Sequence, residues 1–182
     1  MKLVDKIVAA SQNPTSAKSR VTAVVAPIFV FFFLFPTLLF LIPNFLLDKW
    51  FNLPTFGDTA VRPIIGSVLI VLGVFFLLWT TKAQREIGKG TPMPLMATQK
   101  LIIQKPYCYC RNPLFFGLLN FYFGISIVIG SISSFVVVAI FSTIVLAYVK
   151  LIEEKELEKR FGDDYIAYKH TTPFLFPRLK SR

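Results

Sequence analysis

The stretch LFFGLLNFYFGISIVIGSISSFVVVAIFSTIVLAYV, residues 114–149, decides the fold. It contains two apolar runs, Leu114–Ile129 and Phe135–Val149, separated by the Gly/Ser-rich segment 130–134. Apolar runs of this length joined by a short turn predict an antiparallel helical hairpin in a membrane. Each run measures only about 24 Å at ~1.5 Å per residue, so flanking residues or a thin bilayer must complete the crossing.

Two more apolar runs precede the hairpin. Ala23–Pro43 is long enough to span a bilayer, and Pro27 and Pro36 inside it predict a bent or broken helix. Ile64–Trp79 follows Pro63, a residue type that suits the first turn of a helix. The sequence therefore predicts an all-α protein with about four transmembrane helices.

Composition supports a membrane protein. Apolar residues make up 54% of the 182 residues and charged residues only 16%, against about 25% charged in soluble domains. The net charge is +10, and 18 of the 20 Lys and Arg residues fall on one side of a four-span topology. The positive-inside rule then places both termini in the cytoplasm. Topology accounts for the basic charge, so we expect no nucleic-acid partner.

The N-terminal segment is not expected to be a cleaved signal peptide, because its charged part extends to Arg20 and a span-length apolar run follows. Residues Met1–Ala10 are expected to form a short helix at the membrane interface. We divide the chain into residues 1–80, with two spans, and residues 81–182, with two further spans and all the candidate chemistry.

The cytoplasmic blocks 81–113 and 150–182 exclude several kinds of site. His170 is the single histidine, and Cys108 and Cys110 stand two apart with no second pair, so no metal site is expected. Hydrolase, dinucleotide and nucleotide-triphosphate motifs are also missing from the sequence.

Two segments of the second loop are candidates for binding. Residues 88–94 (GKGTPMP) mix glycines with prolines, which suits either a plain turn or a backbone shaped around a ligand. Asn112 and Pro113 predict a capped helix start whose positive end lies beside Arg111, ready for an anion. Within that span, Gly117, Asn120 and Gly124 form a small face that suits helix packing or a lipid-like substrate.

The C-terminal tail carries a second group of candidates. Glu153 and Glu154 lie within one turn of the membrane end of the fourth span, where acids favour a binding role over a solvated face. Leu157, Phe161 and Tyr165 form one apolar stripe that packs inward. Glu156 and Arg160, four residues apart, predict an ion pair on this helix.

These residues together resemble the superfamily of isoprenylcysteine carboxyl methyltransferases and phospholipid N-methyltransferases. These integral membrane enzymes use S-adenosylmethionine, and an R-[HN]-P-x-[YF] motif opens one span while a Glu-Glu pair closes the site. The matching residues, spread over about 85–170, are Gly90-Thr91-Pro92, Pro94, Leu101-Ile102, Pro106-Tyr107, Tyr109, Arg111-Asn112-Pro113, Phe115, Gly117, Glu153-Glu154, Leu157, Phe161-Gly162, Tyr165 and Tyr168.

The resemblance implies a cytoplasmic S-adenosylmethionine pocket formed by the second loop and the tail. The residues implied to bind the cofactor are Leu101, Ile102, Tyr107, Asn112, Pro113, Phe115, Glu153 and Glu154. Glu154 and Arg111 are the candidate catalytic residues, and an amine acceptor would lose its proton to Glu154 or to water. Lys150 and Asn120 are the candidate residues for the lipophilic or lipidated substrate.

Three departures from the superfamily leave the acceptor open. Asn112 stands where the carboxyl methyltransferases usually have His, and Phe115 where they usually have Tyr. Val149 stands where they tend to have an Arg that grips a substrate carboxylate, and the adjacent Lys150 is a point charge rather than a fork. Prenylcysteine carboxylates, phospholipid amines and other membrane-dissolved nucleophiles all remain candidates.

Two other functions are weighed against a methyltransferase. A membrane reductase of the sterol-reductase type would bind NADPH and should show extra basic residues for the 2′-phosphate. A non-catalytic membrane scaffold should lack a cofactor-shaped cytoplasmic cavity. The combination of Asn112-Pro113 with Glu153-Glu154 favours the methyl donor.

Overall fold

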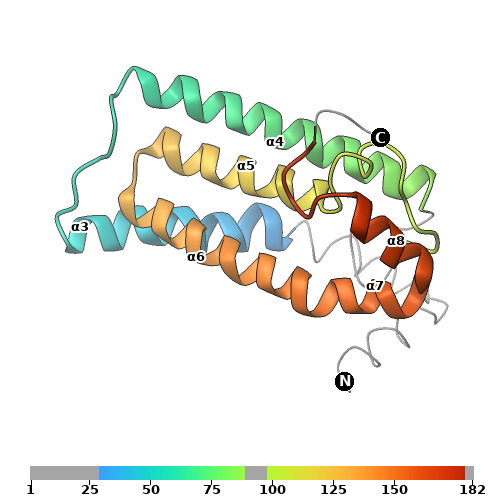
Figure 1. Cartoon of the computed structure of the whole chain (residues 1–182). Coiled ribbons are helices and arrows are strands. Elements are labelled where there is room, and N and C mark those ends of the chain that lie inside the picture. Colours follow the sequence, from blue (N-terminus) through green and yellow to red (C-terminus); the bar gives the residue numbers. More distant parts are fainter. Residues whose placement is uncertain (1–28, 89–97, 179–182) are drawn as a thin grey trace.

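The computed structural model describes residues 29–88 and 98–178, and every regular element in those ranges is helical (Figure 1). The all-α prediction is therefore confirmed for this part of the chain. The expected interfacial helix at Met1–Ala10, the start of the first span and residues 89–94 of the GKGTPMP segment lie outside the described residues.

The first helical segment contains three π-helical stretches, η1 (Val30–Leu34), η2 (Thr37–Leu41) and η3 (Pro43–Leu47), and ends in α3 (Asp48–Trp50). The backbone is helical from residue 29 to residue 50, so the expected break at Pro36 takes the form of π turns. Because proline has no N–H, it removes one donor from the α-helical ladder, and the neighbouring turns widen. The helix also continues through Pro43, where the prediction ended it.

Helix α4 (Val61–Glu86) is longer at both ends than the predicted run 64–79. Its start is fixed by Asp58, whose Oδ1 accepts hydrogen bonds from the backbone N–H groups of Ala60 and Val61 at 2.8 and 3.2 Å. With 26 residues, this helix does not need the thin bilayer inferred from the apolar run alone.

Helices α5 (Pro113–Ile129) and α6 (Ile132–Tyr148) form the predicted hairpin. Gly130 turns the chain with a φ of +73°, a conformation that glycine adopts without strain. The Ser131 side chain then accepts a hydrogen bond from Ser134 N at 3.0 Å and caps α6. Helix α6 continues without interruption through η5 (Val149–Glu153) into α7 (Glu154–Phe161).

Helices α4 and α5 pack closely because glycines face each other across the interface. A Cβ built on Gly66 or Gly124 would lie 2.7 Å from the carbonyl oxygen of the other residue, and Gly73 and Gly117 oppose each other in the same way. The glycine face predicted on α5 is thus used for helix packing, as expected of small residues between membrane helices.

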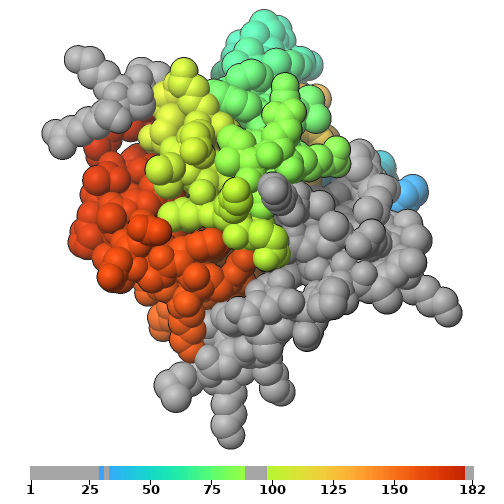
Figure 2. All heavy atoms as spheres, turned by 90° about the vertical axis from the view of Figure 1, so that its right-hand side faces the viewer, coloured from blue at the N-terminus to red at the C-terminus, as the bar shows by residue number. Residues whose placement is uncertain are grey.

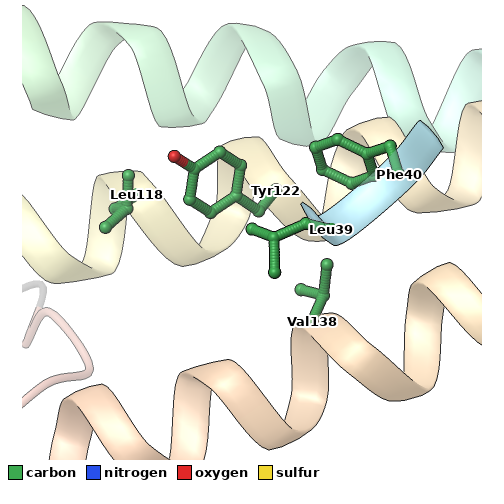
Figure 3. Packing of buried hydrophobic residues seen from close by; sticks show 5 residues of the cluster. All are labelled: Leu39, Phe40, Leu118, Tyr122 and Val138. Atoms are coloured by element: carbon green, nitrogen blue, oxygen red, sulfur yellow. The ribbon is translucent and has the colours of Figure 1, made fainter. Parts of the chain in front are cut away.

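The hydrophobic core lies where the first helical segment meets α5 and α6. Its buried residues, which point toward one another in Figure 3, are Leu39, Phe40, Leu118, Tyr122 and Val138. The outer faces of α4 and α6 instead expose many large apolar side chains. Within the described residues, two helical stretches are long and apolar enough to cross a membrane, Val61–Glu86 and the stretch Ile132–Thr171 that begins with α6, and α5 is a shorter apolar helix.

The helices alternate in direction, so the connecting segments gather at two opposite ends (Figure 1). The loop 51–60 and the turn between α5 and α6 lie at one end. The segment 98–112, α7 and α8 (Asp163–Thr171) lie at the other. The predicted placement of most Lys and Arg residues on one side of the membrane depends on this arrangement.

Candidate active site

A cavity of about 260 Å³ lies at the end of the molecule formed by segment 98–112, α7 and α8. Figure 2 looks onto this end, where the C-terminal part of α4, the following segment and the C-terminal helices lie side by side. The residues that line the cavity are Gln84, Thr98, Leu101, Ile102, Tyr107, Arg111, Asn112, Leu114, Phe115, Tyr148, Glu153, Glu156, Leu157, Arg160, Phe161, Tyr165 and Tyr168.

The structure brings most of the predicted cofactor residues together around this cavity. Of the eight, the lining includes Leu101, Ile102, Tyr107, Asn112, Phe115 and Glu153. Pro113 and Glu154 are buried beside the cavity but do not line it. The predicted inward stripe of Leu157, Phe161 and Tyr165 is also present in its wall.

The C-terminal tail is fastened along the segment that precedes α5. The backbone N–H of Arg111 donates to Pro173 O at 2.9 Å, and that of Arg178 donates to Tyr109 O at 3.0 Å. The hydroxyl of Tyr168 donates to the carbonyl of Tyr107 at 2.7 Å. These bonds connect parts of the chain about 60 residues apart and hold one wall of the cavity in place.

Asn112 precedes α5 as predicted, but its side chain does not cap the helix. Its Nδ2 donates instead to the carbonyl oxygen of Phe174, 2.9 Å away in the tail. The prediction of a side-chain cap is therefore wrong: the amide is held by the tail through Nδ2, and its oxygen makes no capping bond. Pro113 does occupy the first helical turn, where its missing N–H costs no hydrogen bond.

The helix formed by η5 and α7 lines the cavity with one face, and another face points away from it. Glu153, Glu156, Leu157 and Arg160 line the cavity, a spacing of three and four residues that marks one helical face. Successive residues on an α-helix point about 100° apart, so Glu154 faces away from the cavity.

Glu153 supplies the cavity with a carboxylate that has no ion-pair partner within the described ranges. Burial and, to a smaller extent, the neighbouring Glu156 and Glu154 together raise the pKa of this carboxyl from 4.5 to about 7. A carboxyl group with a pKa near 7 can hold or accept a proton at neutral pH.

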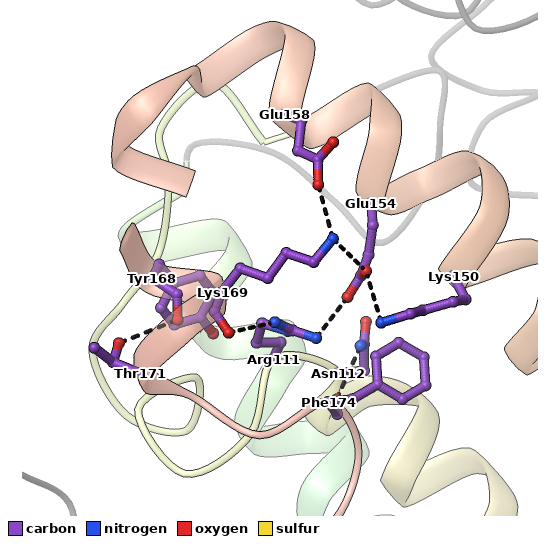
Figure 4. A network of polar contacts seen from close by, with 9 residues as sticks. All are labelled: Arg111, Asn112, Lys150, Glu154, Glu158, Tyr168, Lys169, Thr171 and Phe174. Carbon is purple, nitrogen blue, oxygen red and sulfur yellow. Dashed lines mark hydrogen bonds and ion pairs between the residues drawn. The ribbon is translucent and has the colours of Figure 1, made fainter. Parts of the chain in front are cut away.

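Glu154 instead forms the centre of an ion-pair cluster (Figure 4). Arg111 Nη2 lies 2.8 Å from its Oε1, and Lys169 and Lys150 lie 3.1 and 3.3 Å from its Oε2. Lys169 also contacts Glu158 at 2.8 Å. Arg111 further donates to the Lys169 carbonyl at 2.7 Å, so the cluster joins the start of α5 to both α7 and α8.

A second ion pair borders the cavity. Arg160 Nη1 lies 3.1 Å from Glu156 Oε1, which confirms the predicted pair. The other guanidinium nitrogen of Arg160 donates to the carbonyl of Thr98. Both arginines of the cavity wall, Arg111 and Arg160, are thus each paired with a carboxylate.

The two residues expected on the substrate side do not line the cavity. Lys150 pairs with Glu154 and lies over the ring of Phe174, 5.0 Å from its centroid. Asn120 donates to the carbonyl of Phe116 at 2.7 Å, within its own helix.

Sequence reasoning missed Gln84, a buried residue of α4 in the cavity wall. Its Nε2 donates to the hydroxyl of Tyr107 at 2.8 Å. A single glutamine near the end of an apolar helix carries no recognisable motif, and only the folded chain brings it to Tyr107. Arg160 was noted in the sequence only as an ion-pair partner of Glu156, although it also lines the cavity.

Cys110 is not suited to nucleophilic chemistry. Cys110 is fully buried, and burial raises the pKa of its thiol to about 12, so it stays protonated at neutral pH. Within residues 29–88 and 98–178, no group of three or more His, Cys, Asp or Glu side chains could hold a metal ion.

The cavity combines a polar part with an apolar part. The polar groups are the carboxylates of Glu153 and Glu156, the amide of Gln84 and the hydroxyl of Tyr107. The apolar part is formed by Leu114, Phe115 and Tyr148, which belong to the ends of the apolar helices α5 and α6. Such an arrangement can bring a polar ligand and an apolar one into contact.

Comparison with known proteins adds one finding. No curated protein and no solved structure matches the chain significantly. The profile of the phospholipid methyltransferase family matches residues 61–164, more than half of the chain and the part that contains α4, α5, α6 and both glutamates. The chain therefore belongs to the phospholipid methyltransferase family.

Proposed function

We propose that this protein is an S-adenosylmethionine-dependent methyltransferase, embedded in the membrane by about four spans, that methylates a lipophilic acceptor at the cytoplasmic face. The observation that carries the proposal is the cavity itself. It joins Glu153, a carboxylate without an ion-pair partner among the described residues, to an apolar wall at the ends of α5 and α6. Family membership supports methyl transfer in general.

The residues around the cavity fit the cofactor chemically. One oxygen of the Glu153 carboxylate matches ribose hydroxyls of the cofactor, which leaves the other oxygen for the acceptor. Aromatic side chains such as Tyr107, Phe115 and Tyr165 offer ring faces to a positively charged sulfonium. The buried Oε1 of Gln84 has no hydrogen-bond partner in the described structure and would accept a donor from a ligand.

When bound, the cofactor supplies an electrophilic methyl group. The chain's own contribution is positioning, which provides much of the rate when two reactants must meet in one geometry. The Arg111–Glu154 ion pair and the tail hold the walls of the cavity rigid. Leu114, Phe115 and Tyr148 admit the apolar part of the acceptor.

The charges of the cavity favour an amine acceptor over a carboxylate. Arg111 and Arg160 are both paired with carboxylates, so neither is free to bind an acidic acceptor. Glu153 would repel such an acceptor, whereas it would attract an ammonium group and accept its proton. In this proposal the base is Glu153, and the previously expected Glu154 holds Arg111 in place.

The same charges argue against the NADPH-dependent reductase. A 2′-phosphate requires free cations, and both arginines that line the cavity are paired with carboxylates. The cavity likewise argues against a plain membrane scaffold.

The proposal is tested by methyl transfer from labelled S-adenosylmethionine in detergent–lipid micelles. One sample contains phosphatidylethanolamine and the other a prenylcysteine with a free carboxylate. We expect label in the phospholipid, and loss of at least 10² in rate in Glu153→Gln with Glu86→Gln unaffected. Label in the prenylcysteine alone would contradict the amine assignment, and label in neither would contradict methyl transfer to these lipids.

A further inference from the structure

Gln84 is a buried polar residue whose hydrogen bonds are incomplete. It lies on the last turns of α4 with an exposed fraction of 9%, and it is one of the residues that line the cavity. One side of the amide is used, since Nε2 donates to the Tyr107 hydroxyl at 2.8 Å. The other side, Oε1, is buried without a partner in the described structure. Buried polar groups without a partner are uncommon in folded proteins and call for an explanation.

The Gln84–Tyr107 pair is held rigidly. The carbonyl of Tyr107 accepts the Tyr168 hydroxyl at 2.7 Å, which fixes the segment on which Tyr107 lies. Because the Tyr107 oxygen already accepts from Gln84, its own proton is free to donate. The pair therefore offers one acceptor and one donor side by side, on two residues that line the cavity. If the amide is turned by 180°, the two roles exchange and the pair still offers one of each.

An adjacent acceptor and donor match the edge of a heteroaromatic ring that carries an amino group next to a ring nitrogen. Adenine has this edge, with the N6 amino group as donor and N1 as acceptor. The remaining lining is suitable for such a ring, because Phe161 and Tyr165 provide apolar and aromatic surface in the same cavity.

We propose that Gln84 and Tyr107 together recognise the amino edge of the adenine ring of the cofactor, and that Gln84 is a specificity-determining residue. This inference rests on the proposed use of S-adenosylmethionine. The adenine amino group would satisfy the Gln84 amide, and the Tyr107 hydroxyl would bond N1. The ribose and amino-acid parts would then extend toward Glu153, a carboxylate of the same cavity.

Thr80 provides a matched control. It lies one turn before Gln84 on α4, is fully buried, and its Oγ1 also lacks a partner in the described part of the chain. Thr80 does not line the cavity. Removing its hydroxyl with Thr80→Val should therefore leave ligand discrimination unchanged.

The test is calorimetric binding of two ligands to the full-length protein in detergent. One is S-adenosylhomocysteine and the other is its analogue that lacks the 6-amino group. We expect the wild-type protein and Thr80→Val to bind the analogue about 5- to 10-fold more weakly, the typical effect of one buried hydrogen bond. In Gln84→Leu, which keeps the side chain's approximate volume, the two ligands should bind equally.

The possible outcomes separate the two proposals. If the wild-type protein binds both ligands equally, the role of Gln84 is overturned while cofactor use stands. If Gln84→Leu still prefers the amino ligand, discrimination lies elsewhere and the inference is overturned as well. If the folded wild-type protein binds neither ligand, cofactor use fails and the inference fails with it. The wild-type comparison needs no variant, so a misfolded Gln84→Leu does not prevent the test.

Discussion

The guanidinium of Arg111 lies 2.8 Å from the carboxylate of Glu154, and their side chains are only 6% and 2% exposed. Arg111 immediately precedes α5, and Glu154 begins α7, so this pair connects two elements on either side of the cavity. Removing one member of a buried pair leaves the other charge without compensation, which is more costly than the pair itself is stabilising.

Glu154→Gln is therefore expected to lower stability strongly. Arg111 would keep its charge in a buried position, and the expected loss is about 3–5 kcal/mol in the free energy of unfolding. The measurement is the thermal unfolding midpoint of the detergent-solubilised protein. Lys82→Ala is the control, because the Lys82–Glu86 pair is exposed and 3.9 Å long, and such pairs contribute little. An unchanged midpoint in Glu154→Gln together with lost cofactor binding would instead identify Glu154 as a ligand of the cofactor.

The pH dependence of stability should report on Glu153. Its pKa is about 7 in the folded protein, against 4.5 without the surrounding structure. Between these two values the folded state holds a proton that the unfolded state has released. The free energy of unfolding therefore falls as pH rises from about 4.5 to 7, and the loss persists above pH 7.

Glu153→Gln removes this group, so the pH profile of the unfolding midpoint should become flatter between pH 4.5 and 7. Glu86→Gln, a change at an exposed position on α4, should retain the wild-type profile. Identical profiles for the wild-type protein and Glu153→Gln would show that Glu153 titrates normally. The proposed role of Glu153 as the base for the amine would then lose the support of a raised pKa.

The α4–α5 interface should not tolerate a methyl group. In Gly73→Ala the new Cβ would lie 2.6 Å from Phe121 N and 2.7 Å from Gly117 O, and backbone atoms cannot give way cheaply. We expect a loss of about 1–3 kcal/mol, typical of overpacking, seen as a lower unfolding midpoint. Ser67→Ala, at an exposed position of the same helix, should have little effect. Equal stability of the two variants would mean that the helices are not in close contact.

The membrane topology is tested by labelling single cysteines from each side of sealed vesicles, after Cys108 and Cys110 are replaced by Ser. Thr55→Cys and Asp163→Cys are exposed at opposite ends of the helices. A membrane-impermeant thiol reagent should label Asp163→Cys only from the cytoplasmic side and Thr55→Cys only from the other. Labelling of both from the same side would contradict the four-span topology.

Much of the fold was predictable because it depends on hydrophobic length. The α5–α6 hairpin follows directly from two apolar runs around Gly130, and α5 ends at the predicted residue. The start of α4 was placed too late because the capping residue, Asp58, precedes the apolar run. The π turns around Pro36 depend on how neighbouring helices accommodate a missing donor, which hydropathy does not reveal.

The site was predictable in its members but not in their orientation. Glu153 and Glu154 are adjacent and identical in sequence terms, and only the helical register decides which faces the cavity. The π turn η5 (Val149–Glu153) lies immediately before Glu154 and shifts that register. Asn112 was expected to cap α5, but the tail residue Phe174 binds its amide, a contact 62 positions away in the sequence.

The central claim is tested most directly by calorimetry of the purified, folded protein with S-adenosylhomocysteine and, separately, with NADPH. We expect saturable heat with S-adenosylhomocysteine, loss of that heat in Glu153→Ala, its retention in Glu158→Ala, and none with NADPH. Saturable binding of NADPH, or no binding of S-adenosylhomocysteine by protein that unfolds cooperatively on heating, would contradict the account.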